Sequence, residues 1–282
     1  MSKVAAVTVL YYPDVNLISN ISSYIDQVDV LYMIDNSDEP KGNIIKDLES
    51  KNKIQFINNK GNKGIAVTLN MAALKSIEDN YDFLLTMDQD STISDNYVKK
   101  MMSEFEKDKK IGMLSPFVVH TANPKKPQST GLEEVMVAMT SGCIIRLSAY
   151  KKTGGFLEKL FIDYVDNEFS LRMRISGYKI YQLNSVCVYH KLGNTEPRNF
   201  LFRKVFPTNH SAIRWYYRTR NRLYVYKKYR NIFPDYVKFD IKAFLKDFSK
   251  ILLYESNKIK KMKMIIRGYL DFKKDKYGKF IN

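Results

Sequence analysis

Short apolar runs alternate with segments of helical spacing over the first 90 residues of the chain. Four runs have the length and apolar content of buried strands, at residues 4–12, 28–34, 54–57 and 81–87. Apolar side chains recur at helical intervals between them, at residues 17–25, 44–48 and 65–77. Strands and helices that alternate in this order favour a parallel sheet with helices on both faces. We therefore predict an α/β fold whose polar strand ends gather along one edge of the sheet.

The regular pattern ends further along the chain. Residues 115–135 carry three prolines and predict a long loop. Past residue 202 the spacing becomes helical, and residues 239–254 and a stretch around 259–270 each place apolar side chains on one side of a helix. The sequence thus predicts a helical C-terminal region built differently from the sheet.

Charge divides the chain at the same place. Residues 1–202 contain 24 Lys or Arg and 24 Asp or Glu, whereas residues 203–282 contain 22 and 6, so the C-terminal region holds the whole net charge of +16. We predict two domains, a catalytic one at 1–202 and a basic helical one at 203–282. Basic amphipathic helices are typical of attachment to an anionic membrane surface, and also of helices packed on their own enzyme.

Composition limits the cellular setting. Cys143 and Cys187 lie in apolar surroundings and are too few for a disulfide framework, so we interpret them as reduced core thiols. The N-terminus lacks the pattern of a signal peptide, and no stretch approaches the ~20 apolar residues of a membrane span. We expect a cytoplasmic protein, either soluble or peripheral to the inner face of the membrane.

Two aspartates follow the fourth predicted strand, in Asp88-Gln89-Asp90. Residues i and i+2 of an extended backbone point to the same side, so both carboxylates converge where the strand leaves the sheet. Ligands of open α/β sheets bind beyond the carboxyl ends of strands. Two carboxylates at that place suit Mg²⁺ or Mn²⁺, with a diphosphate completing the coordination shell. A polar turn after a strand is the alternative for this motif alone.

Six further motifs accompany this one over about 190 residues. In chain order, the seven are Ile34-Asp35-Asn36-Ser37, Asn62-Lys63-Gly64-Ile65-Ala66, Met87-Asp88-Gln89-Asp90-Ser91, Thr140-Ser141-Gly142, Phe161-Ile162-Asp163-Tyr164-Val165-Asp166-Asn167-Glu168, His190-Lys191-Leu192-Gly193 and Arg220-Asn221-Arg222. In this order they resemble the family 2 inverting glycosyltransferases of the GT-A fold, and among them the bacterial rhamnosyltransferases of O-antigen and capsule synthesis. The resemblance implies a Rossmann-like, mostly parallel mixed sheet flanked by helices, with the basic α-helical region as a C-terminal extension.

The resemblance also implies a donor site. It places the Asp35 carboxylate against the nucleotide base, although an Asx turn is an equally good explanation of an Asp at a strand end. Gly64 lets the backbone approach a ligand at a helix N-terminus, which favours anions. The residues assigned to the nucleotide sugar are Thr8, Tyr11, Asp35, Asn62, Gly64, Asn70, Asp88 and Gln89. A late histidine completes the metal shell in several related enzymes, so the metal ligands are assigned as Asp88, Asp90 and His190.

Asp163 and Asp166 are the two candidates for the catalytic base. Inverting transfer needs a carboxylate that takes the proton of the acceptor hydroxyl. In the family pattern this carboxylate belongs to the Asp of a Glu-Asp pair, and that Asp aligns with Asp166. Here Val165 replaces the Glu; we predict Asp166 as the general base and keep Asp163 as the alternative.

Two segments are candidates for contact with the acceptor. Thr140, Ser141 and Gly142 precede an apolar run, where small residues leave room for a sugar ring or serve close packing. The resemblance places Arg220 and Asn221 on the acceptor side, in a segment of mixed aromatic and basic residues. For the neighbouring residues, a helix with an aromatic core face and a basic solvent face explains the same pattern.

The sequence therefore predicts a metal-dependent glycosyltransferase that takes L-rhamnose from dTDP-L-rhamnose to a lipid-diphosphate-linked saccharide. A donor such as a UDP-linked hexose or galactofuranose is the alternative within the family. A nucleotidyltransferase would carry a Gly-rich basic loop after the first strand, where this chain has Tyr11-Tyr12-Pro13-Asp14. A nucleic-acid-binding protein is disfavoured because residues 1–202 are neutral overall. A homo-oligomer remains possible.

Overall fold

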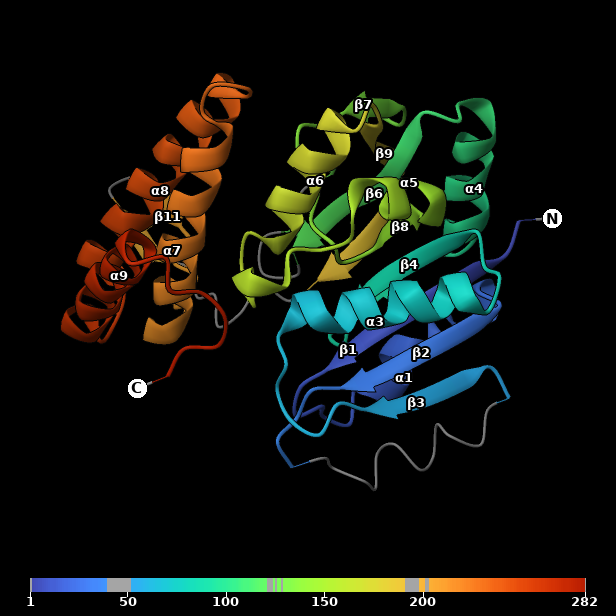
Figure 1. Ribbon diagram of the computed structural model, residues 1–282, viewed down its shortest axis with the longest axis horizontal. Coiled ribbons are helices and arrows are strands. Elements are labelled where there is room, and N and C mark those ends of the chain that lie inside the picture. The colour runs from blue at the N-terminus through green and yellow to red at the C-terminus, as the bar shows by residue number, and fades with distance from the viewer. Residues whose placement is uncertain are drawn as a thin grey trace. The chain divides into compact units, whose positions relative to one another are not determined.

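The computed structural model describes residues 2–39, 52–120, 124, 126–127, 129–190, 198–200 and 203–281. By its internal contacts the chain forms two compact units, coloured along the chain in Figure 1. The first comprises Met1–Glu158 and Val165–Lys191, and the second comprises Lys159–Tyr164 and Leu192–Asn282. The predicted domain boundary at residue 202 falls at residues outside the described part, and it stays a prediction.

Parallel strands form the first half of the main sheet. They are β1 (Val4–Leu10), β2 (Val30–Asp35), β3 (Ile54–Asn58) and β4 (Phe83–Asp88), in the order β3-β2-β1-β4. The register pairs Leu10 with Asp35 and Val9 with Asp88, so the carboxyl ends of these strands lie in line. The predicted parallel sheet and its polar edge are confirmed.

The second half of the sheet is mixed. It consists of β5 (Ser91–Ile93), β6 (Ile111–His120), β7 (Leu132–Glu134), β8 (Cys143–Arg146) and β9 (Lys179–His190). From β4 the order continues β8-β6-β9-β5, and β7 also pairs with β9. β8 is antiparallel to β4, and β5 is antiparallel to β9 with Ser91 opposite His190. This last pairing brings the end of β9 to the Asp88-Gln89-Asp90 turn.

Part of the predicted loop at 115–135 is a strand instead. β6 continues to His120, and its pairing with β9 shifts register between Pro116 and Phe117. Proline is tolerated at such an irregularity because the regular hydrogen-bond ladder is already interrupted there. The prolines therefore marked a break in the ladder as well as a loop.

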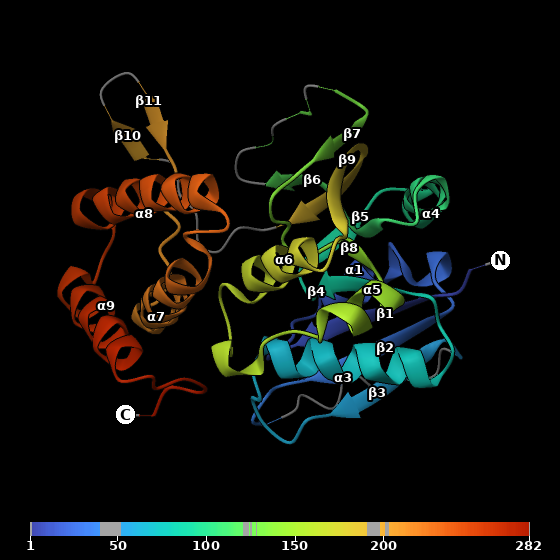
Figure 2. The same cartoon turned by 45° about the horizontal axis from the view of Figure 1, so that its top comes forward.

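Helices cover both faces of this sheet (Figures 1 and 2). α1 (Leu17–Ser22) and α4 (Tyr97–Lys107) pack on one face, where Leu17, Ile21 and Met101 join a continuous core. The other face carries α3 (Ile65–Glu78), α5 (Leu147–Thr153) and α6 (Val165–Ile175). The predicted helix at 44–48 lies outside the described residues.

The second unit is helical, as predicted. It contains α7 (Ala212–Tyr229), α8 (Pro234–Tyr254) and α9 (Lys258–Lys273), together with a hairpin of β10 (Arg198–Phe200) and β11 (Arg203–Val205). α9 packs on α7, and a Cβ at Gly268 would lie only 2.6 Å from the carbonyl oxygen of Tyr216. Among the helices of the described residues, none is long and apolar enough to span a bilayer.

Candidate active site

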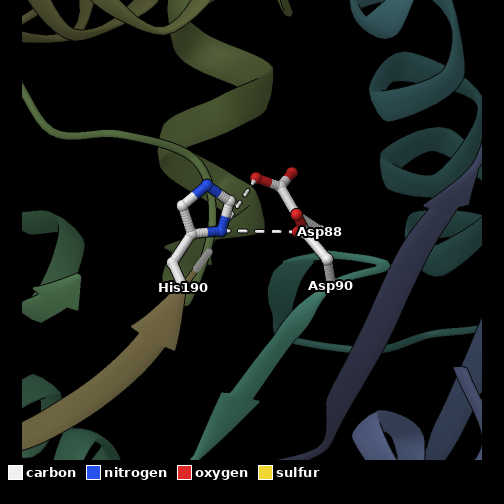
Figure 3. Close-up of side chains that lie close together, drawn as sticks. All are labelled: Asp88, Asp90 and His190. Atoms are coloured by element: carbon white, nitrogen blue, oxygen red, sulfur yellow. Dashed lines mark ion pairs between the residues drawn. The ribbon is translucent and has the colours of Figure 1, made fainter. Parts of the chain in front are cut away.

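Asp88, Asp90 and His190 converge at the carboxyl edge of the sheet (Figure 3). One ligand atom of each side chain lies within 4.8 Å of the others. Nδ1 of His190 is 3.4 Å from Asp90 Oδ1 and 4.0 Å from Asp88 Oδ2. About half of each aspartate side chain is exposed, whereas the imidazole is mostly buried. The structure thus brings together the three predicted metal ligands, two from the β4–β5 turn and one from the end of β9.

Two serines tie this group to the sheet. Ser91 Oγ lies 2.8 Å from His190 Nδ1 and 3.0 Å from Ser141 Oγ, and Ser141 Oγ accepts the backbone N–H of Asp88 at 3.2 Å. All three contacts are within hydrogen-bonding distance. The sequence assigns Ser141 to the acceptor, but in the structure its hydroxyl contacts Asp88 and Ser91 and so helps to position the three candidate metal ligands. Ser91 belongs to the same motif but was not among the predicted site residues.

Gln89 and Tyr11 hold two strand ends together. The Gln89 side chain accepts the backbone N–H of Tyr11 at 2.7 Å and donates to the Tyr11 carbonyl at 3.1 Å. The Tyr11 ring is half exposed beside this contact. Gln89 therefore fixes the end of β1 against the Asp88-Gln89-Asp90 turn. The assignment of Gln89 and Tyr11 as contacts of the nucleotide sugar stays a prediction.

Asp35 ends β2 as a fully buried carboxylate. Its Oδ1 accepts the backbone N–H of Ser37 at 2.8 Å, which is the predicted Asx turn. Its Oδ2 has no hydrogen-bond partner among the described residues. A buried carboxylate oxygen without a donor is unfavourable, because the lost hydration is not replaced. A ligand N–H would satisfy it.

A buried amide network supports the strand ends around Asp35. Asn36 Nδ2 donates to Thr68 Oγ1 at 2.8 Å, and Asn59 Nδ2 donates to Asn36 Oδ1 at 2.7 Å. Thr68 Oγ1 donates in turn to the carbonyl oxygen of Gly64 at 3.0 Å. This network joins β2, β3 and the first turn of α3. Sequence reasoning missed Asn59 and Thr68, whose only signal was a polar residue at the end of a strand or inside a helix.

Gly64 is the N-cap of α3, with a φ of 87°. This conformation suits glycine, and Asn62 Oδ1 accepts the Gly64 N–H at 2.9 Å to close an Asx turn. The N-terminus of α3 thus emerges at the same edge of the sheet. The geometry agrees with the predicted anion-binding turn, and the contact of Asn62 and Gly64 with a donor stays a prediction.

Thr8 and Asn70 use their polar atoms inside the protein. The Thr8 hydroxyl is buried and lies 2.7 Å from the hydroxyl of Tyr24. Asn70 donates to the carbonyl of Phe156 and to Glu158, and its Oδ1 accepts from Phe156 N and from the Tyr150 hydroxyl. These contacts support a role in holding the segment after α5. Direct donor contact by Thr8 or Asn70 stays a prediction.

Gly142 shows why small residues precede β8. Its φ is +80°, and a Cβ there would lie 2.9 Å from Pro116 Cγ and 3.2 Å from Val188 Cβ. Its carbonyl accepts the hydroxyl of Tyr97, and the Thr140 carbonyl accepts that of Thr86. Close packing, one of the two interpretations of this motif, is therefore realised. The structure leaves contact with an acceptor sugar as a prediction.

Asp166 lies in the first turn of α6, in the first unit. Burial raises the pKa of the Cys143 thiol well above its usual value, and the negative charges of Asp166 and Asp88 raise it further. Asp166 belongs to the same unit as Asp88, Asp90 and His190.

Asp163 belongs to the second unit and is engaged by Arg214. Arg214 donates from Nε to Asp163 Oδ2 at 2.8 Å and from an Nη to Asp163 Oδ1 at 2.7 Å. The backbone here is unusual, because Phe161, Asp163 and Tyr164 all have positive φ between 63° and 66°. Bulky residues rarely adopt this conformation unless the surroundings enforce it.

Arg220 and Asn221 are among those surroundings. Both are buried in α7. Asn221 Nδ2 donates to the carbonyls of Leu160, Ile162 and Asp163 at 2.8–2.9 Å, and Arg220 also donates to the Leu160 carbonyl. Their contacts support a role in shaping residues 160–163, and their assignment to the acceptor stays a prediction.

Glu168 differs from the other acids of its motif. It is fully buried and forms a 2.7 Å ion pair with Arg172, which also donates to the carbonyls of Thr153 and Gly155. This pair, which sequence reasoning missed, anchors α6 to the segment after α5. The spacing of Glu168 and Arg172 by four residues was its only sequence signal.

Comparison with solved structures supports the fold. The crystal structure of GalNAc-T7 with UDP, GalNAc and Mn²⁺ matches with a TM-score of 0.64 at 14% identity; it covers 98% of this chain, which spans only 56% of that one. Residues 1–349 of Staphylococcus aureus TarS with UDP-GlcNAc match with a TM-score of 0.65 at 14% identity, covering 96% of this chain and 80% of that one. At such identities the likeness is one of fold.

Sequence comparison identifies the family. The dTDP-rhamnosyl transferase RfbF of Shigella flexneri is 27% identical over 292 aligned residues, which cover 96% of this chain and 95% of RfbF. The sequence model of glycosyl transferase family 2 matches residues 15–174, a segment that includes Asp35, Asp88, Asp90 and Asp166. Since this match extends over more than half of a chain with a GT-A sheet, the protein belongs to glycosyl transferase family 2 and is a glycosyltransferase.

Proposed function

We propose that the protein is a metal-dependent inverting rhamnosyltransferase. Its donor is dTDP-L-rhamnose and its acceptor a lipid-diphosphate-linked saccharide of a cell-surface polysaccharide such as an O-antigen or capsule. The observation that carries the proposal is the joint position of the Asp88, Asp90 and His190 group and the unpaired Asp35 carboxylate at one sheet edge. The similarity to RfbF along almost the whole chain supports the choice of sugar.

The metal group fits a divalent cation. It offers two carboxylates and one imidazole within 4.8 Å of one another, a donor set that suits Mn²⁺ and suits Mg²⁺ less. A cation held there would neutralise charge on the diphosphate leaving group. Ser91 and Ser141 keep the ligands in place.

The carboxylate of Asp166 is the proposed general base. In the transfer step the acceptor hydroxyl oxygen bonds to the anomeric carbon of the donor, the bond from that carbon to the diphosphate breaks, and Asp166 takes the hydroxyl proton. Asp163 is less suited, because both of its oxygens accept hydrogen bonds from Arg214 and its charge is neutralised by that guanidinium.

Asp35 is the proposed contact of the nucleotide base. Its buried, unpaired Oδ2 can accept the ring N–H that thymine and uracil share. This carboxylate disfavours adenine and cytosine, whose corresponding ring nitrogen carries no hydrogen, but it does not separate dTDP from UDP. A UDP-linked hexose or galactofuranose is accordingly the second candidate donor, and the UDP complexes of GalNAc-T7 and TarS favour keeping it.

A thermal-shift panel tests the proposal, because a ligand that binds only the folded state raises the melting temperature. We expect dTDP and UDP to stabilise the protein in the presence of Mn²⁺, and stabilisation by GDP but by neither of these would refute the pyrimidine base. Removing Mn²⁺ with EDTA, or the change Asp90→Asn, should abolish the shift. Full activity of Asp90→Asn, or wild-type activity unaffected by EDTA, would refute the metal role.

A transfer assay then decides the sugar. We expect release of dTDP from dTDP-L-rhamnose in the presence of membrane lipid extracts that carry the acceptor. Transfer from UDP-sugars alone would replace the proposed donor by the second candidate. We further propose that the enzyme works at the cytoplasmic face of the membrane, where a lipid-linked acceptor would lie.

A further inference from the structure

Helix α9 exposes an apolar stripe. Ile259, Ile266 and Leu270 lie on one stripe of this helix, at helical spacing, with exposed fractions of 75%, 55% and 44%. The packed side carries the partly buried Met264 and Ile265 together with the buried Lys261, Gly268 and Asp271. A helix packed only for its own protein would bury the isoleucines and expose the lysine.

Specific contacts fix this orientation. The Lys261 ammonium forms a 2.8 Å ion pair with buried Glu255, and the Tyr216 hydroxyl donates to Asp271 at 2.9 Å. Gly268 lies against the backbone of α7 at a distance that excludes a side chain. Rotating α9 to bury Ile259 and Ile266 would break all three contacts and leave buried charges unpaired. The outward apolar stripe is therefore built into the fold.

Basic and apolar side chains surround the stripe. Leu252 and Leu253, at the end of α8, are about half exposed near the turn that leads into α9. This turn borders an open hollow of about 660 Å³ whose lining includes three lysines. Residues 256–282 contain nine Lys or Arg and only two Asp. The exposed basic residues of α9 are Lys258, Lys260, Lys263, Arg267 and Lys273.

We propose that this surface, the exposed stripe of α9 with Leu252 and Leu253 of α8, inserts into the headgroup region of an anionic bilayer. Helices that lie in a membrane interface combine an aliphatic face with flanking lysines, whose ammonium groups reach the lipid phosphates. Each basic residue near an anionic surface adds to this attraction. Membrane binding at this surface would bring the enzyme to a lipid-linked acceptor, and only this last point rests on the proposed function.

Other occupants of the surface are disfavoured by its charge. In a two-fold dimer the same patch lies on both copies, so lysines would face lysines. Interfaces between proteins are depleted in lysine at their centre, whereas this patch interleaves lysine with isoleucine and leucine. An anionic lipid surface is complementary to both parts of the patch, because its acyl chains accommodate the aliphatic side chains and its phosphates pair with the ammonium groups.

Vesicle sedimentation with the full chain tests the proposal. We expect the protein to pellet with vesicles that contain phosphatidylglycerol, to pellet weakly with pure phosphatidylcholine, and to dissociate as salt is raised. The double change Ile266→Gln with Leu270→Gln should lower the partition coefficient roughly tenfold or more. Leu74→Gln is the matched control, because Leu74 is 60% exposed on α3 and lies outside the patch.

Insertion can be measured separately. A tryptophan at the patch, Ile266→Trp, should be quenched by brominated lipid, whereas Leu74→Trp should not. Trp215 is fully buried and gives the same background in both proteins. Equal quenching of the two variants, or equal pelleting of the double variant and the wild type, would overturn the insertion.

Two further outcomes would also overturn the proposal. Absence of pelleting with any vesicle would exclude a lipid partner, and a dimer in light scattering that the double variant dissociates would assign the patch to a second copy. Stabilisation by dTDP and Mn²⁺ is measured on each variant. If it persists while vesicle binding fails, the membrane proposal falls and the proposed enzymatic function stands.

Discussion

Arg214 holds Asp163 through two parallel hydrogen bonds of 2.8 and 2.7 Å, which agrees with the prediction of Asp166, rather than Asp163, as the general base. Asp163 lies among backbone positions with positive φ and belongs to the second unit. Asp166, three residues on, lies in the first turn of a regular helix of the first unit. Both oxygens of Asp163 are thus already engaged by a guanidinium, whereas a general base needs an oxygen directed at the acceptor hydroxyl.

Replacing Asp166 and Asp163 by asparagine, each in a separate variant, should therefore have different effects on kcat. We expect Asp166→Asn to bind dTDP and Mn²⁺ normally and to lose roughly 10²-fold or more in kcat, the range for a removed general base. Asp163→Asn should lose less, and Arg214→Lys should lose about as much as Asp163→Asn. If these last two changes act on one ion pair, their double variant is no worse than either alone. A large loss with Asp163→Asn and none with Asp166→Asn would exchange the two roles.

The Asn221 amide should matter more for stability than for binding. Asn221→Ala removes the Nδ2 donor of the carbonyls of Leu160, Ile162 and Asp163, all near residues of positive φ. Leaving these buried carbonyls without the Asn221 donor should cost about 3–5 kcal/mol of unfolding free energy. Urea denaturation measures this loss, with the exposed Asn231→Ala as the matched control. A loss below about 1 kcal/mol would show that the carbonyls find other donors.

Most of the sheet could be predicted because strands leave a local signal. Apolar runs such as the one before Asp88 have the length of a strand, and the alternation with helices implies parallel order. The backbone period of two predicted the convergence of Asp88 and Asp90, but β4 ends at Asp88 and it is the turn at Gln89 and Asp90 that brings the second carboxylate back to the first. His190 could be placed near them only by resemblance, because the pairing of β5 with β9 joins residues far apart in the chain.

Long-range partners and helix orientation could not be predicted. Nothing local distinguishes Asn221, a buried donor to three carbonyls, from an amide that faces an acceptor sugar. The pairing of Asp163 with Arg214 likewise depends on tertiary structure. In α9 the spacing of Ile259, Ile266 and Leu270 predicts an amphipathic helix, but only packing decides that its apolar side is exposed.

Asp35 should govern nucleotide affinity. Asp35→Asn keeps the shape and the oxygen that accepts the Ser37 N–H, but it can turn an N–H toward the ring N–H of the base. We expect the Kd values of dTDP and UDP to rise about tenfold to a hundredfold and by similar factors, since a hydrogen bond to a charged group contributes about 1.5–3 kcal/mol. Titration calorimetry measures both, with the exposed Asp14→Asn as control. Unchanged affinity would remove Asp35 from the base site.

Acid should weaken the second unit through His210. Burial, together with the positive charges of Arg218 and Arg214, lowers the pKa of His210 to about 4. The unfolded chain then binds a proton near pH 6.5 that the folded chain refuses until about pH 4, so stability falls as the pH falls through this window. We expect a loss of about 1–3 kcal/mol that His210→Gln lacks. Parallel stability curves of the two proteins between these pH values would contradict this.

His190 should set the preference between Mn²⁺ and Mg²⁺. Its Nδ1 faces both aspartates, at 3.4 Å from Asp90 and 4.0 Å from Asp88. Imidazole is a good ligand for Mn²⁺ and a poor one for Mg²⁺, which prefers oxygen. His190→Asn replaces the ring by an amide oxygen, so Mn²⁺ should bind roughly tenfold more weakly in the presence of dTDP while Mg²⁺ changes little. Ser91→Ala, which removes only the hydroxyl 2.8 Å from Nδ1, is the matched control and should have a smaller effect on both ions.

Titration of free Mn²⁺ by electron paramagnetic resonance measures the affinity directly, and Mg²⁺ affinity follows from competition. An equal loss for both ions would mean that His190 positions the aspartates, and unchanged Mn²⁺ binding would exclude it from the shell.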